Sequence, residues 1–243
     1  MPCHTKASSP SRWTIAPQGD RCLMVQLGNG MDVAIGQRCA LVATALRAAG
    51  ISGITDIVPT FDAVAVHYDP RLFGAASSHK NLPIQIESVL AELGGADVDS
   101  RARLVEIPVC YGGEHGPDLA DVAQQCGLTP EEVIALHSGT PAYVFMLGFA
   151  PGAPYIGIHD AALSIGRRET PRTLLPAGSV AIANRQTMIY PNASPGGWHI
   201  LGATPAVLFD PAREPATLLA PGDSVRFVPI SASEYEAMKR GQP

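Results

Sequence analysis

Glycine and proline are concentrated between Tyr143 and Pro211, and this concentration restricts the fold more than any other feature of the sequence. Three stretches combine the two residue types, and each lies before a short apolar run: 148–152 (GFAPG), 176–179 (PAGS) and 194–198 (SPGGW). Glycine permits positive φ angles whereas proline fixes φ, so together they specify turns of defined shape. We therefore expect a β framework whose shaped loops carry binding or catalytic residues.

The composition limits the class of protein. The chain has 243 residues, of which 46% are hydrophobic, so it is long enough for one large or two smaller globular domains. A net charge of −5, without a cluster of Lys and Arg, argues against nucleic-acid binding. Residues 1–13 lack the apolar core of a signal peptide, and no apolar run is long enough to cross a bilayer. We therefore expect a cytoplasmic protein without membrane association.

Sequence motifs for metal and phosphate binding are missing. The five cysteines are dispersed, so we expect reduced thiols and no metal site. There is no Walker-type phosphate loop, no G-x-S-x-G elbow and no H-E-x-x-H. Any nucleotide site is therefore of another kind or lies on a partner chain.

The hydrophobic pattern changes along the chain and predicts two domains, 1–100 and 104–243. In the first domain the predicted order is β-β-α-β-β-α, with helices over 33–49 and 82–93 that cover a small sheet. A polar stretch over 94–103 is the expected linker. This first domain is therefore of the α+β class.

The second domain is predicted to be rich in short strands. Two short helices, over 117–126 and 130–138, follow its first strand, and a further helix is expected after residue 231. Many short strands with turn residues between them are typical of a β barrel or sandwich. We expect these strands over 104–110, 143–149, 179–183, 187–190, 198–202, 206–209 and 224–228.

His137 is the candidate catalytic residue. Thr129 and Glu132 have the spacing of a capping box, so a helix is expected to begin there and to end at Gly139. Val133 and His137 would share one face, which predicts a half-buried imidazole near the helix end. The sequence leaves two interpretations open: a structural histidine bonded to a nearby carbonyl, or an acid/base or substrate-orienting group.

Candidate substrate-binding residues lie in the three Gly/Pro stretches and on the strands beside them. Backbone N–H groups of the first stretch could face a ligand beside an aromatic wall, and consecutive small residues in the third could form an anion nest. Ordinary turn and strand-end residues are the alternative interpretation at each position. The candidates are Gly148, Phe149, Pro151, Gly152, Tyr155, Ser179, Gln186, Tyr190, Ser194, Gly196, Gly197 and Trp198.

An ordered series of short motifs gives the sequence a family resemblance. The series includes 107–111 (IPVCY), 116–119 (GPDL), His137-Ser138, the three Gly/Pro stretches, Pro171-Arg172, Gln186-Thr187, 189–191 (IYP) and 208–211 (LFDP). Together these motifs resemble the allophanate hydrolase subunit 1 family, which includes the kinase inhibitor KipI and the B subunit of bacterial 5-oxoprolinase. The resemblance covers nearly the whole chain and is strongest from Ile107 to Pro211.

The resemblance implies both a fold and a function. It implies a ferredoxin-like N-terminal domain followed by a cyclophilin-like β barrel, and a larger subunit 2 as partner. In the 5-oxoprolinase branch that partner is the C subunit, and the pair works with an A subunit to convert 5-oxo-L-proline to L-glutamate with ATP and Mg²⁺. We expect an enzyme subunit of this branch that is inactive alone. A small amide or lactam would bind at the barrel mouth, between His137 and the 148–152 and 194–198 loops.

Two other members of the family suggest alternative functions. One is a KipI-like inhibitor that binds a sensor histidine kinase, and the other is subunit 1 of an enzyme that hydrolyses allophanate or urea-type amides. The sequence departs from the family pattern at Ala153, Asn184, Met188 and Ala203. The last of these replaces a common Arg, which would remove a possible contact to a carboxylate or phosphate.

Overall fold

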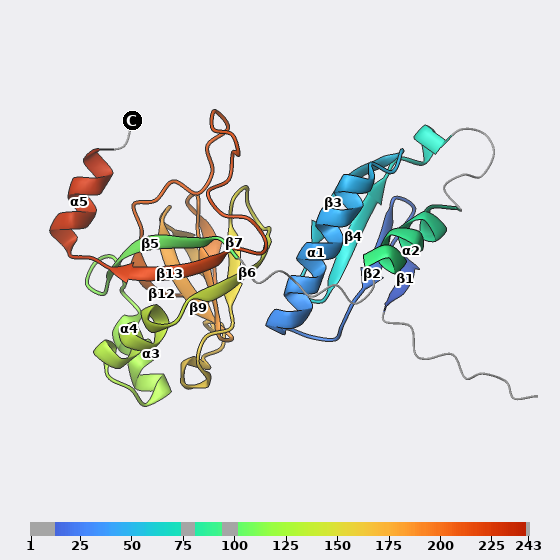
Figure 1. The fold of residues 1–243 in the computed structure, drawn as a ribbon. Coiled ribbons are helices and arrows are strands. Elements are labelled where there is room, and N and C mark those ends of the chain that lie inside the picture. Colours follow the sequence, from blue (N-terminus) through green and yellow to red (C-terminus); the bar gives the residue numbers. More distant parts are fainter. Residues whose placement is uncertain (1–12, 74–80, 94–101, 242–243) are drawn as a thin grey trace, which may run out of the picture. The chain divides into compact units, whose positions relative to one another are not determined.

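The computed structural model describes residues 13–73, 81–93 and 102–241, which form mixed α/β structure (Figure 1). The chain divides into two compact units, residues 1–98 and 99–243. Most of the predicted linker over 94–103 lies outside the described residues. Each unit is described by itself.

The first unit is a four-stranded antiparallel sheet with two helices. Its strand order is β1-β2-β4-β3. The predicted succession β-β-α-β-β-α is confirmed, and a short 3₁₀ turn, η1 (Pro70–Phe73), precedes the second helix. The elements are β1 (Thr14–Pro17), β2 (Cys22–Gln26), α1 (Val33–Ala49), β3 (Ile54–Pro59), β4 (Ala63–Tyr68) and α2 (Leu82–Leu93).

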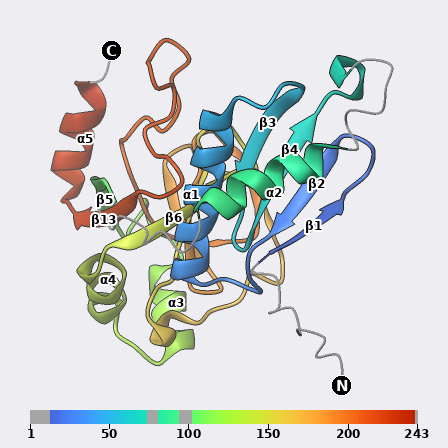
Figure 2. The same ribbon diagram turned by 45° about the vertical axis from the view of Figure 1, so that its right-hand side comes forward.

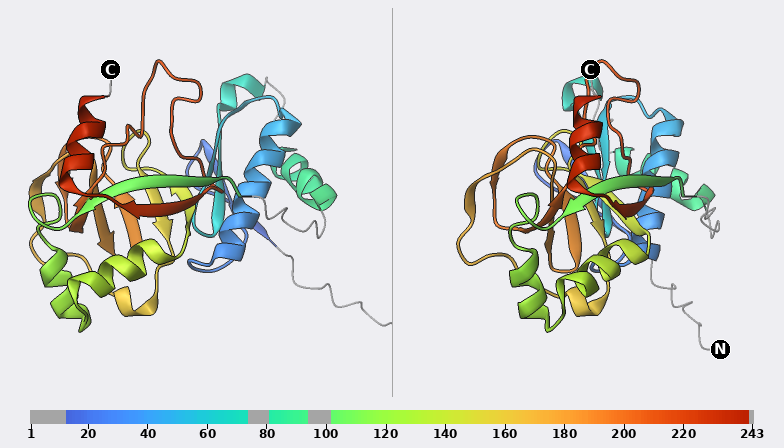
Figure 3. Two further views of the ribbon diagram at one scale, coloured as in Figure 1. Left: turned by 60° about the vertical axis from the view of Figure 1, so that its left-hand side comes forward. Right: turned by 90° about the vertical axis from the view of Figure 1, so that its left-hand side faces the viewer.

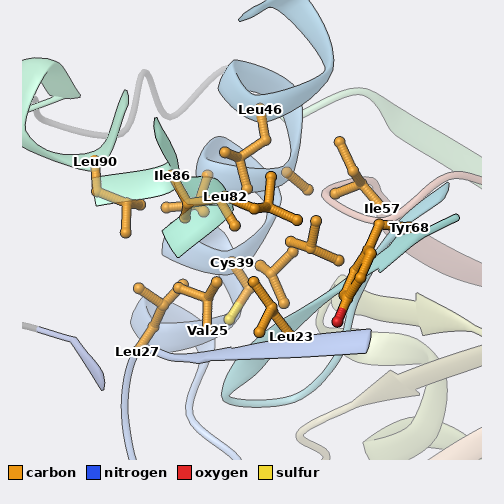
Figure 4. Packing of buried hydrophobic residues seen from close by; sticks show 14 residues of the cluster. Leu23, Val25, Leu27, Cys39, Leu46, Ile57, Tyr68, Leu82, Ile86 and Leu90 are labelled. Atoms are coloured by element: carbon orange, nitrogen blue, oxygen red, sulfur yellow. The ribbon is translucent and has the colours of Figure 1, made fainter. Parts of the chain in front are cut away.

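Helix α1 has clear signals at both ends. The Asp32 carboxylate accepts hydrogen bonds from the backbone N–H groups of Ala34 and Ile35, and the helix ends at Gly50 with a φ of 58°. A left-handed residue at this position favours glycine. Helices α1 and α2 lie side by side on one face of the sheet (Figure 2), and Cys39, Leu46, Leu82, Ile86 and Leu90 pack against Leu23, Val25 and Ile57 (Figure 4).

The second unit contains a closed seven-stranded barrel with the order β10-β7-β6-β13-β5-β12-β9. Strands β5 and β13 are parallel, and the other pairs are antiparallel. Alternate residues, among them Val144, Ile156, Val180 and Phe227, fill the interior. The barrel strands are β5 (Leu104–Tyr111), β6 (Ala142–Leu147), β7 (Pro154–Gly157), β9 (Ser179–Ala183), β10 (Gln186–Ile189), β12 (His199–Ala203) and β13 (Ser224–Pro229).

Four strands of this unit differ from expectation. Residues 206–209 were predicted as a strand, but only an isolated bridge between Phe209 and Thr217 forms there. Strand β7 was not predicted, and neither was the small ribbon of β8 (Arg172–Leu175) and β11 (Ser194–Gly196). The third Gly/Pro stretch therefore begins as a strand and not as a loop. Ser-Pro-Gly has low intrinsic β propensity, so its pairing with β8 depends on the tertiary fold.

Helices lie outside the barrel strands. α3 (Leu119–Cys126) and α4 (Pro130–Gly139) pack with η3 (Ala161–Leu163) against Ile182 and Leu201. The C-terminal helix α5 (Ala232–Arg240) lies across strands β5 and β13 from the α3–α4 pair (Figure 3). Across the described ranges, no helix combines the length and apolar character needed to cross a membrane.

Candidate functional site

A buried network of four side chains, Tyr111, His137, His159 and Thr187, occupies the barrel interior; we call it the inner histidine network. Thr187 lies two residues before Ile189 on β10, so both side chains are on the same face of the strand and point inward. Its hydroxyl lies 2.8 Å from Nε2 of His137 and 2.8 Å from Nε2 of His159. The Tyr111 hydroxyl lies 2.7 Å from Nδ1 of His137. Because a threonine hydroxyl has one proton, it donates to one imidazole and accepts from the other.

His137 is fully buried, so the prediction of a half-buried imidazole was wrong. The predicted capping box of Thr129 and Glu132 is confirmed, and α4 ends at Gly139 as expected. The helix carries His137 into the barrel, where the side chain is 0% exposed. Its ring stacks on that of Phe227, at 4.3 Å, and on that of His159, at 4.8 Å, and these two rings lie 6.2 Å from each other.

Burial makes the members of this network neutral. Burial lowers the pKa of His159 to about 4, with a smaller contribution from the charge of Arg185. Burial also lowers the pKa of His137 well below its usual range, and the neighbouring His159 adds to the effect. Burial raises the pKa of Tyr111. The four side chains therefore stay hydrogen-bonded to one another across the barrel while all of them are neutral.

Three of the aromatic candidates lie together on the outer side of the barrel. Tyr155, Tyr190 and Trp198 belong to one cluster, in which the rings of Tyr155 and Trp198 meet edge to face at 6.3 Å. The Tyr190 hydroxyl leaves no room for a side chain at Gly196, since a Cβ there would lie about 2.4 Å from it. Gln186 is the first residue of β10 and pairs with Gly157 of β7. These residues form a wall outside the barrel, whereas His137 lies inside it.

The first Gly/Pro stretch is a tight turn between β6 and β7. The Gly148 N–H donates to the carbonyl of Ala153 at 3.0 Å, so this amide is used within the turn. Gly152 has a φ of 77°, and a Cβ there would lie 3.0 Å from the Leu208 carbonyl oxygen. Pro151 is exposed, and Phe149 is 62% exposed with its ring edge to face with that of Tyr190 at 6.1 Å. The exposed ring is the group of this turn that is available to a ligand or a partner.

The two serine candidates have different surroundings. Ser179 donates to the carbonyl of Pro176 at 2.7 Å and closes the second Gly/Pro stretch. Ser194 lies on β11, and its buried hydroxyl has no hydrogen-bond partner among the described residues. The carbonyl oxygen of Gly197 accepts a hydrogen bond from the backbone N–H of Arg168 at 2.7 Å. Neither Gly196 nor Gly197 has a positive φ, and Gly196 pairs with β8.

Asp118 forms a buried ion-pair cluster that was not predicted from the sequence. Arg172 binds its carboxylate with two nitrogens at 2.6 and 2.7 Å, Arg168 binds it at 2.9 Å, and the Ile200 N–H donates to it at 2.7 Å. Burial alone would raise the pKa of Asp118, but the Arg172 hydrogen bonds, the Ile200 amide and the two cationic charges lower it overall. The motifs 116–119 and Pro171-Arg172 contain these residues, but nothing local indicates that they meet.

Two cavities flank the Asp118 cluster. The Arg172 cavity has a volume of about 370 Å³ and is also lined by Ser179, Ala203 and residues of α5. The His199 cavity has a volume of about 440 Å³ and is lined by Arg167, Arg168 and residues of α3. No group of three or more His, Cys, Asp or Glu side chains within the described ranges is placed to hold a metal ion.

Comparison with known proteins identifies the family. Residues 13–219 match the family described as carboxyltransferase domain, subdomain C and D. The chain is 39% identical over 236 residues to the B subunit of 5-oxoprolinase from Bacillus subtilis (strain 168), and the match covers 94% of this chain and 97% of that protein. The chain therefore belongs to the carboxyltransferase subdomain C and D family.

Solved structures contain the same fold within longer chains. The structure of TTHA0988 has a TM-score of 0.75 and 38% identity, and the match covers 87% of this chain and 40% of that one. The Kluyveromyces lactis urea carboxylase has a TM-score of 0.72 but 20% identity, over 93% of this chain and 22% of that one. This second likeness concerns the fold alone. The chain spans two fifths of TTHA0988 and less than a quarter of the urea carboxylase.

Proposed function

We propose that the chain is the B subunit of a cytoplasmic, ATP-dependent 5-oxoprolinase that converts 5-oxo-L-proline to L-glutamate. The observation that carries this proposal is the 39% identity to the B subunit of the Bacillus subtilis 5-oxoprolinase over nearly the full length of both chains. A lactam carbonyl is a poor electrophile, and its phosphorylation by ATP would make ring opening feasible. The chain contributes one part of this machinery and is inactive alone.

The partners in this proposal are the larger C subunit, which corresponds to subunit 2 of the family, and the A subunit. In TTHA0988 the matched region is joined to further sequence, which fits a protein that works beside another polypeptide. ATP and Mg²⁺ act in the assembled complex, and we assign no residue of this chain to them.

The candidate residues take different roles in this proposal. Phe149, which is exposed, faces the substrate or the partner protein, and the buried rings of Tyr190 and Trp198, with Tyr155, form the cluster that supports it. His137 supports this cluster from the barrel interior as a positioning residue, because both of its ring nitrogens already have partners. We also propose that the two units correspond to a ferredoxin-like and a cyclophilin-like domain.

The test is reconstitution with the A and C subunits from the same source. We expect ATP hydrolysis that depends on 5-oxoproline only when all three proteins are present, with glutamate formed in proportion. A complete set that does not respond to 5-oxoproline would rule the assignment out. The same mixture should be given urea and allophanate, because activity with either would favour an amide-hydrolysing enzyme of the other branch.

A further inference from the structure

The C-terminal helix α5 lies against the side of the barrel and buries a single side chain there (Figure 3). Of its nine residues, Tyr235 is buried, at 5% exposure, and the other eight are exposed. Helix α3, which is one residue shorter, buries three. Short helices are marginal in water by themselves, and elements with few buried contacts open at a small cost in free energy. Of the described α-helices of this unit, α5 is therefore the one that detaches most easily.

Tyr235 packs in a small apolar cluster that is separate from the barrel interior. The cluster consists of Tyr235, Cys110 of β5 and Ala203 of β12, with Ile230 at its edge. Cys110 and Ala203 are paired in register, so Tyr235 contacts two neighbouring strands at one point. The ring of His115 lies 4.3 Å from that of Tyr235. The residues that fill the barrel interior belong to another cluster, so detachment of α5 would leave that interior packed.

The polar contacts of α5 are internal to the helix and its cap. Ser231 Oγ accepts a hydrogen bond from the Glu234 N–H at 3.2 Å, and the Glu234 carboxylate accepts one from the Ser231 N–H at 2.7 Å. The Lys239 ammonium lies 5.6 Å from the centre of the Tyr235 ring. Within the described ranges, no ion pair or hydrogen bond joins residues 232–241 to the barrel strands. The helix can therefore leave the barrel without breaking a polar contact.

The junction between β13 and α5 provides a hinge. β13 pairs with β5 as far as Pro229, and the Ile230 N–H extends this pairing by donating to the Val109 carbonyl at 2.9 Å. Ser231 follows with extended backbone, at φ −73° and ψ 163°, and the helix begins at Ala232. Rotation about the backbone of Ser231 would move α5 and leave the pairing of β5 with β13 intact.

α5 forms one wall of the Arg172 cavity. Tyr235, Glu236 and Lys239 line this cavity of about 370 Å³ from the helix. The other walls include Arg172, which binds Asp118, and part of the second Gly/Pro stretch. Because three lining residues leave together with the helix, its detachment would turn the cavity into open surface of the barrel.

We propose that α5 is a hinged cover, which detaches from the barrel at Ser231 and opens the Arg172 cavity and the Cys110 thiol to solvent while the barrel stays folded. With α5 in place, Tyr235 shields Cys110 and the helix limits the approach to Arg172. With α5 away, both groups are open to small molecules. This motion is independent of the reaction that the assembled complex catalyses.

The Cys110 thiol reports the motion directly. It is 5% exposed, and burial together with the charge of Glu114 raises its pKa, so it reacts slowly while α5 is in place. Pulses of N-ethylmaleimide on the full native chain, mapped by peptide mass spectrometry, measure the labelling of Cys110 separately from that of the other cysteines. Hydrogen exchange followed by NMR measures the opening equilibrium of individual amides. We expect Cys110 and the α5 amides to share one opening equilibrium, at least tenfold more favourable than that of the β9 amides.

Two results would overturn the proposal. One is labelling of Cys110 that is no more favourable than the opening of the β9 amides, because Cys110 would then be exposed only when the barrel unfolds. The other is rapid exchange confined to the last turn of α5 while Cys110 stays protected, because the helix would then fray at its end without leaving the barrel.

Matched variants of α5 separate a hinged cover from a structural helix. Tyr235→Ala removes the buried anchor and should raise the labelling rate of Cys110 at least tenfold, with unchanged exchange of the β9 amides. Met238→Ala changes an exposed side chain of the same helix and should label Cys110 as slowly as wild type. If Tyr235→Ala accelerated β9 exchange by the same factor as Cys110 labelling, α5 would belong to the cooperative unit of the barrel, and the hinged cover would be ruled out.

Discussion

The inner histidine network and the Asp118 cluster are both buried polar groups of the barrel unit, and they satisfy their hydrogen bonds in opposite ways. In the network, one threonine hydroxyl is shared by two neutral imidazoles. In the cluster, one carboxylate is neutralised by two arginines. Because the shared hydroxyl and both imidazoles are neutral, the network can be buried in the barrel interior without a counter-charge. Two cations around one anion leave a net positive charge, and this charge lies between the two cavities.

This difference indicates where ligands reach the protein. Arg168 and Arg172 each line a cavity, so the charged cluster is accessible from both sides. His137 has no exposed surface, and its ring contacts those of Phe227 and His159 in the interior. We therefore assign recognition to the surroundings of Asp118 and mechanical support to the histidines. Four predictions test this division, from the largest expected effect to the smallest.

Removal of the carboxylate should have the largest effect. Asp118→Ala leaves the guanidinium groups of Arg168 and Arg172 and the Ile200 N–H without their shared buried partner, which should lower the free energy of unfolding by about 3–5 kcal/mol. Denaturant unfolding followed by Trp198 fluorescence, in a Trp13→Phe background, measures the barrel unit. Glu106→Ala is the control, because it breaks the exposed pair with Arg226 and should cost little. Equal losses in the two variants would show that the cluster is not structural.

Acid should act on the network before it acts on the cluster. Because the pKa of His159 is about 4 in the folded chain and about 6.5 when unfolded, the unfolded chain binds more protons between these values. The stability is therefore full above pH 6.5 and decreases by about 3 kcal/mol as the pH falls toward 4. The pKa of Asp118 is also lowered, so its contribution is lost only below the unfolded value of 3.8.

The pH dependence can be assigned with a variant. His159→Gln lacks one titrating imidazole and should reduce the slope between pH 6.5 and 4 without abolishing it, because the lowered pKa of His137 also contributes there, while the loss below 3.8 persists. The free energy of unfolding measured across this range checks both statements. An unchanged slope in the variant would mean that other groups cause the acid sensitivity.

Local signals explain the parts of the fold that the sequence predicts well. Helix α1 forms over the residues that were predicted from their helical spacing, and it ends at Gly50; the structure adds the Asp32 cap at its start. The capping box at Thr129 likewise fixes the start of α4.

The parts that were missed depend on contacts between distant residues. Asp118 and Arg172 are 54 positions apart, and His159 and Thr187 are 28 positions apart. No helical or strand period connects such pairs, and their meeting follows from barrel closure. His137 was identified as important, but its depth could not be read from its helix, because the neighbouring Phe227 comes from the last strand of the barrel.

Loss of the shared hydroxyl should have an intermediate effect. Thr187→Val has nearly the same shape but leaves Nε2 of both His137 and His159 without a partner, which should cost about 2 kcal/mol. Thr187→Ser retains the hydroxyl and removes one methyl group, at a cost of about 1 kcal/mol. Unfolding measurements at about pH 7.5, above the ordinary pKa of histidine, compare them with both histidines neutral. If valine proves no worse than serine, the hydroxyl does not hold the network together.

The smallest effect should come from a change that preserves charge at the cluster. Arg172→Lys retains a cation beside Asp118 but cannot reproduce the two-nitrogen contact at 2.6 and 2.7 Å, so it should cost about 1.5 kcal/mol. If net charge alone mattered, the variant would be as stable as wild type. The same unfolding assay decides between these outcomes, and high salt refines the result. A lysine contact through a single, more exposed charge should weaken with salt, whereas the buried arginine fork should not. A salt-sensitive wild type would contradict the view that geometry, rather than charge alone, distinguishes this cluster from the neutral network.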